Sequence, residues 1–265
     1  MAFFLRDKQV LNVEVDEVRL RQFIQLFQGF HATVTAGMTP EQAAAEWFLS
    51  YIIRFDEKGY RVFTQTEVVD LFNQAHTVER VVVTLDSRES LSSNRQTGTW
   101  AELKVDAFSP GNSWLQVTSD HRGNVDAAFC AVEEALESSK TWFRFVRTGP
   151  ARFAIQLVAI IITFAASLWG ASVIASSLTV QNAFPLAFLF VFVLLSNAWT
   201  FVHPWALRRL DRLFPNIYFK RANREPWTWL WQALVASVVF AVLTALALVM
   251  FNYIASSLSP FLLKK

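Results

Sequence analysis

Residues 153–207 read "FAIQLVAIIITFAASLWGASVIASSLTVQNAFPLAFLFVFVLLSNAWTFVHPWAL" and contain no Asp, Glu, Lys or Arg. A helix needs about 20 mainly apolar residues to cross a bilayer. This stretch of 55 residues is therefore long enough for two spans. The segment "QNAF" marks the break between them, because Pro185 fits the first turn of a second helix. We expect spans near residues 153–178 and 184–202.

A second uncharged stretch lies further along the chain, at residues 226–263. Its length exceeds that of one span, and we expect the span near residues 229–251, followed by an interfacial tail. The sequence thus predicts an α-helical membrane domain with three transmembrane helices over residues 141–265.

The charges are divided unevenly along the chain, although the total is only +2. Residues 1–139 contain 12 Lys or Arg and 20 Asp or Glu, a net charge of −8. Residues 140–265 contain 12 Lys or Arg and 2 Asp or Glu, a net charge of +10. This asymmetry indicates a soluble domain, residues 1–140, joined to the membrane domain. An acidic domain repels phosphates, so we expect no nucleic acid as a partner.

Basic residues predict the orientation of the spans, because they favour the cytoplasmic side. They precede the first span and fill the loop 203–228, where Arg208, Arg209 and Arg212 lie. Trp142, Trp227 and Trp229 stand at the same ends, as is typical of headgroup anchors. We expect a bacterial inner-membrane protein with a cytoplasmic N-terminal domain, and the basic loop to dock on that acidic domain.

Small residues recur at every fourth position in two of the predicted spans, which favours close packing of helices in lipid. Packing within the chain and self-association into a homo-oligomer both remain open. The residues concerned are Ala159, Thr163, Ser167 and Ala171 in the first span, and Ala233, Ser237 and Ala241 in the third.

The N-terminal half mixes helical and strand patterns. An amphipathic helix begins near Asp16, and apolar and polar residues alternate in segments bounded by turns. We predict an α+β domain with an antiparallel sheet of about five strands and helices on one face.

One face of this predicted sheet is polar. Its alternating residues include two tryptophans among charges, which suits a contact with a protein. The alternative is that this face packs against the helix 16–30. The candidate interaction surface consists of Trp100, Glu102, Lys104 and Trp114.

No catalytic, metal-binding or cofactor-binding motif stands out. The single cysteine, Cys130, forms no disulfide within the chain. The four histidines are scattered, and the chain has no glycine-rich phosphate-binding loop. The junction 119–126, which holds Asp120 and His121, has residues that suit either an anion site or an ordinary helix cap. We therefore expect no cofactor.

The leading hypothesis is a membrane-anchored interaction or signalling module, whose cytosolic domain binds a protein or a small-molecule ligand. One alternative is a membrane-permeabilising effector that oligomerises through its spans. Another is a membrane-tethered enzyme that uses Asp120 or His121. The lipid bilayer is a partner in all three.

Overall fold

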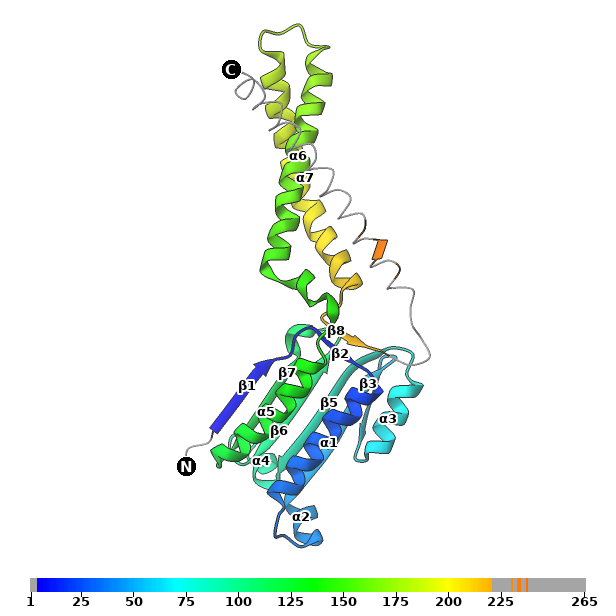
Figure 1. Cartoon of the computed structure of the whole chain (residues 1–265), viewed down its shortest axis with the longest axis vertical. Helices are drawn as coiled ribbons and strands as arrows, with labels where there is room; N and C mark the ends of the chain where they lie inside the picture. The colour runs from blue at the N-terminus through cyan, green and yellow to red at the C-terminus, as the bar shows by residue number, and fades with distance from the viewer. Residues whose placement is uncertain (1–3, 221–229, 231–232, 235–236, 238–265) are drawn as a thin grey trace, which may run out of the picture. The chain divides into compact units, whose positions relative to one another are not determined.

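The computed structural model describes residues 4–220, 230, 233–234 and 237 (Figure 1). These residues form two compact units. The first unit contains the residues up to Arg144 and also residues 215–220. The second contains residues 145–214 and also residues 230, 233–234 and 237. In chain order, residues 145–214 thus lie between two parts of the first unit.

A six-stranded antiparallel sheet forms the centre of the first unit, with the order β1-β7-β6-β5-β3-β4. The predicted sheet of about five strands lacked β1, whose charged sequence hides its alternation. The strands are β1 (Phe4–Gln9), β3 (Trp47–Phe55), β4 (Lys58–Val62), β5 (Val78–Ser87), β6 (Trp100–Asp106) and β7 (Trp114–Ser119).

Three helices cover one face of this sheet: α1 (Glu17–Val34), α3 (Gln65–Gln74) and α5 (Arg122–Ser138) (Figure 1). Asp16 caps α1 by accepting a hydrogen bond from the amide of Arg19. The apolar stripe of α1 packs with Val83 and Leu103 of the sheet in one hydrophobic core. The prediction of an α+β domain with helices on one face is confirmed. Because α1 lies on the apolar face, the idea that it covers the polar face is wrong.

Two short helices, α2 (Pro40–Glu46) and α4 (Arg88–Ser92), and two 3₁₀ turns, η1 (Pro110–Asn112) and η2 (Trp142–Arg147), complete the connections. Thr39 and Gln42 form a capping box at the start of α2.

A small second sheet holds together segments that are distant in the sequence, and we call it the junction sheet. It consists of β2 (Val13–Val15), β8 (Ile217–Phe219) and residues 139–141. β2 pairs in parallel with β8 on one side, and Val13 bridges Lys140 on the other. The segment "NIYF" (216–219), which contains β8, belongs to the first unit.

The second unit contains a hairpin of two helices, α6 (Gly149–Ala175) and α7 (Ala183–Leu213). Gly170 lets Val191 approach closely, since a Cβ at Gly170 would lie 3.3 Å from the valine side chain. The rings of Phe164 and Phe188 meet edge to face at 5.5 Å.

Among the described residues, one helix is long and apolar enough to cross a membrane, namely α7, where the sequence predicted three. The described apolar part of α6, Ala159–Ala175, is shorter than a span. The predicted third span, 229–251, lies almost entirely outside the described residues. Helix α7 also runs through Pro204 to Leu213, so the predicted loop does not begin at residue 203. Proline removes one backbone hydrogen bond, but membrane helices tolerate this loss.

Candidate ligand-binding groove

Helices α1 and α5 run antiparallel over the same face of the sheet. At the end near the junction sheet, Arg19 of α1 donates hydrogen bonds to the hydroxyl and carbonyl oxygens of Ser138 at 3.0 and 3.2 Å. At the other end, the C-terminal half of α1 faces the N-terminal half of α5 across an open groove of about 330 Å³. The floor includes Ala101 and Val117 of the sheet.

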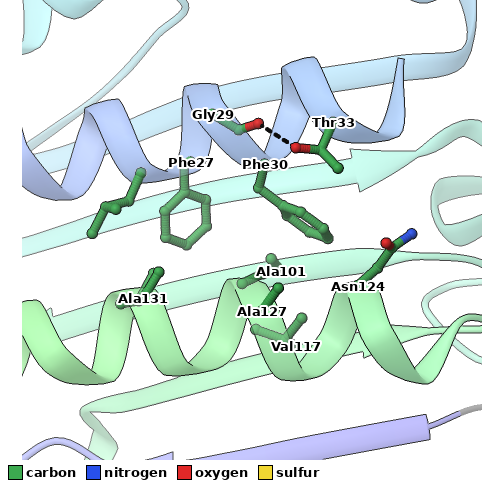
Figure 2. Close-up of a pocket in the computed structure, with 12 residues that line it drawn as sticks. Phe27, Gly29, Phe30, Thr33, Ala101, Val117, Asn124, Ala127 and Ala131 are labelled. Atoms are coloured by element: carbon green, nitrogen blue, oxygen red, sulfur yellow. Dashed lines mark hydrogen bonds between the residues drawn. The ribbon is translucent and has the colours of Figure 1, made fainter. Parts of the chain in front are cut away.

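The two walls of the groove are apolar, and one has larger side chains than the other (Figure 2). Phe27 and Phe30 project from α1, whereas α5 contributes mainly the methyl groups of its alanines. The α5 lining consists of Asn124, Ala127, Ala128, Ala131 and Val132. Small side chains on one helix opposite large ones on the other would allow the two helices to pack closely. Here the space beside the α5 alanines is unfilled, and this space forms the groove.

Gly29 contributes to this space from the middle of α1. Nothing lies within 4 Å of the position that its Cβ would take. The glycine has helical backbone angles that any residue adopts, and it costs about 0.5–1 kcal/mol relative to alanine inside a helix. Neither backbone conformation nor close packing within the described structure explains a glycine at this position.

Few polar groups line the groove. The Thr33 hydroxyl donates to the carbonyl oxygen of Gly29 at 3.0 Å (Figure 2), which occupies its proton. Asn124 of α5 places a side-chain amide across the groove, at the same end of the lining as Thr33. His31 adds no charge to this part of α1 at neutral pH, because burial lowers its pKa below the ordinary 6.5. The groove suits an uncharged apolar body with one hydrogen-bonding group.

The four residues of the predicted interaction surface come together on the other face of the sheet. The Trp114 indole donates to a Glu102 carboxylate oxygen at 3.0 Å, and Lys104 lies 4.2 Å above the Trp114 ring. Trp100 is covered by the Arg95 guanidinium at 4.7 Å and is only 8% exposed. These contacts stabilise the face internally and leave little of Trp100 or Glu102 for a partner.

Arg95 organises this polar face, and sequence reasoning missed it. It lies in the loop after α4, where the residue pattern resembles an ordinary polar turn. Its guanidinium forms ion pairs with Asp86, at 3.0 Å, and with Glu102. The available signal was the pair of acidic residues Asp86 on β5 and Glu102 on β6, because buried carboxylates require a cation.

The junction before α5 does not form a catalytic arrangement in the described structure. His121 and Asp120 are exposed, and their nearest nitrogen and oxygen are 3.8 Å apart. The Ser119 hydroxyl accepts from Thr99 at 2.9 Å and contacts Asp120 at 3.1 Å. No side chain caps the N-terminus of α5.

The predicted membrane residues have different environments. Ala159, Ser167 and Ala171 of α6 are buried within the helical hairpin, with Thr163 partly buried in the same row. Arg208, Arg209 and Arg212 are exposed on α7, with Arg209 5.4 Å from the Trp205 ring. Ala233 and Ser237 are exposed. Trp227, Trp229, Ala241 and the Trp142 side chain lie outside the described structure.

No protein-family model matches the chain, and neither a curated protein nor a solved structure shows significant similarity to it.

Proposed function

We propose that this protein is a membrane-anchored sensor module, whose α+β domain binds a small apolar molecule in the α1–α5 groove. The volume of about 330 Å³ is in the range of small-molecule sites, and such sites are mainly apolar with a few polar groups. It is too small for a folded partner. Helix α7 supports the membrane anchor through its length and apolar composition.

Gly29 is the observation that carries this proposal. A glycine inside a helix destabilises the helix by about 1 kcal/mol relative to alanine, so its presence calls for a requirement that offsets this cost. Gly29 is exposed at the lining of the groove, and an added Cβ would lie in open space with no protein atom within 4 Å. A bound molecule that uses the space is the requirement we propose.

The finer topology belongs to the same proposal. The basic residues on both flanks of the hairpin support a cytoplasmic position for the acidic domain, in a bacterial inner membrane with three spans. The proposal of oligomerisation has less support, because the small residues of α6 are buried within the hairpin of one chain.

The test uses the full chain in lipid nanodiscs, with 1-decanol as an uncharged probe that has one hydroxyl group. Alanine methyl resonances report binding, because Ala127 and Ala131 line the groove. Exposed Ala44 on α2 is the internal control. We expect saturable shifts of the groove alanines and none at Ala44.

A matched pair of variants separates a filled groove from a damaged fold. Gly29→Leu adds a bulky side chain at the groove lining and removes the helical penalty of glycine, so the domain stays folded while the shifts disappear. Gly29→Ala is the smaller control and retains most of the binding. If Gly29→Leu binds 1-decanol as the unchanged protein does, the groove is not the site.

A further inference from the structure

We infer that the junction sheet couples occupancy of the groove to the two chain segments that flank the helical hairpin. This inference rests on the proposed function and adds a mechanism by which ligand binding in the groove is transmitted to the segments that flank the hairpin.

Both walls of the groove end at the same strand. Helix α1 follows β2 after a single residue, its cap Asp16. Helix α5 ends at Ser138, and the next carbonyl, that of Ser139, accepts a hydrogen bond from the Glu14 amide at 2.8 Å. Because Arg19 ties the two helices together at this end, a molecule that enters the open end changes their angle about the junction sheet.

The same strand holds the chain before α6 and the chain after α7. On one side, the amide of Thr141 donates to the carbonyl oxygen of Asn12 at 2.8 Å. On the other side, the Val13 amide donates to Asn216 at 3.0 Å, and the Lys220 amide donates to Val15 at 2.9 Å. A rotation or shift of β2 therefore acts on both flanks of the hairpin.

The junction sheet is also incompletely satisfied. Asn12 has a φ of 59°, in the left-handed region. In the described structure, three buried side-chain atoms near the crossing have no hydrogen-bond partner: Asn12 Oδ1, Thr141 Oγ1 and Asn216 Nδ2. Strain and unpaired buried groups destabilise one arrangement relative to others and are common at switch regions. A small change in the angle between α1 and α5 is then enough to alter the pairing.

The first test is reciprocal coupling, measured on the full chain in nanodiscs. Glu14 and Tyr218 are cross-strand partners, so Glu14→Cys with Tyr218→Cys places a disulfide between β2 and β8. Cys130→Ser removes the native thiol. Coupling between two sites acts equally in both directions. We expect the half-saturating 1-decanol concentration to differ at least about fivefold between the oxidised and reduced forms of this variant.

The second test needs no cysteine pair. Saturating 1-decanol should change the hydrogen-exchange rates of the Glu14, Thr141 and Lys220 amides, and Gly29→Leu should abolish the change. Suppose that the groove alanines shift but the 1-decanol affinity is equal in both redox forms, or that hydrogen exchange at these amides is unchanged. Either result overturns the coupling and leaves the binding proposal intact. Absence of groove shifts in the unchanged protein overturns the proposed function itself.

Discussion

Ile217 tests whether the chain after α7 completes the core of the first unit. This residue of β8 is 1% exposed and belongs to the hydrophobic core that the α1 side chains occupy. Substitution by alanine removes three carbon groups, each worth about 0.8 kcal/mol when buried. The loss of transfer free energy is then roughly 2.4 kcal/mol, and the cavity left behind raises the expected cost to about 2–5 kcal/mol.

The assay is proteolysis of the full chain in nanodiscs after equilibration in increasing urea, with loss of the intact domain as the signal. A domain of this size loses roughly 2 kcal/mol of stability per molar urea. Ile217→Ala should therefore lower the urea midpoint by about 1–2.5 M. Leu91→Ala is the matched control, because it removes the same number of carbon atoms from a side chain that is 49% exposed. Its effect should stay within about 0.5 kcal/mol.

Equal midpoints for Ile217→Ala and Leu91→Ala would refute the reasoning. Such a result would mean that β8 lies on the domain without contributing to its core. The contact between the Phe219 and Phe72 rings, at 6.2 Å, would then have no energetic consequence either. The inference that β2 transmits changes to the chain after α7 would also lose its basis.

Three further predictions address other parts of the first unit. Residues 1–144 alone should be much less stable than residues 1–144 joined by a short Gly-Ser linker to 215–225; circular dichroism during urea titration compares them. Arg95→Ala leaves the buried Asp86 and Glu102 carboxylates without their cation, so it should destabilise the domain by about 3 kcal/mol. Arg95→Met would lose the same stability only if stacking on Trp100 contributes little. Lys140 and Lys8 lower the pKa of Glu137 below its ordinary 4.5. The Glu137 carboxylate therefore stabilises the domain above pH 4.5, and this stabilisation is lost as the pH falls through the lowered pKa. Lys140→Met should weaken this pH dependence in melting temperatures measured from about pH 6 to 3.

Local patterns in the sequence were sufficient for most of the sheet. Strands β6 and β7 alternate regularly, β5 is a short run rich in valine, and the caps of α1 and α2 are visible as residue types at fixed spacing. Strand β1 was missed because Arg6 and Lys8 occupy the face that its neighbours fill with apolar residues. Those charges are neutralised by carboxylates of α5 at 2.7–3.1 Å, which is a tertiary contact that β1 alone does not encode.

The groove and the junction sheet were harder to predict for two different physical reasons. Gly29 resembles any exposed helical position until the facing helix is known to carry alanines. β8 has three residues and pairs with a strand about 200 residues earlier, so no periodicity within either segment reveals the pairing. The residues of the polar face were predicted, but their burial was not, because Trp100 is covered by Arg95 from a separate loop.

The hairpin itself explains how such a distant pairing becomes stable. Helix α6 of 27 residues is about 40 Å long and α7 of 31 residues about 46 Å, so two antiparallel helices return the chain close to its starting point. Closing a flexible loop costs entropy that increases with its length. A preformed hairpin avoids most of this cost, so a strand of only three residues is enough to hold the returning chain beside β2. Because the hairpin returns the chain in this way, β2 lies between the segment before α6 and the segment after α7. We therefore expect a ligand that moves β2 to act on both segments at once.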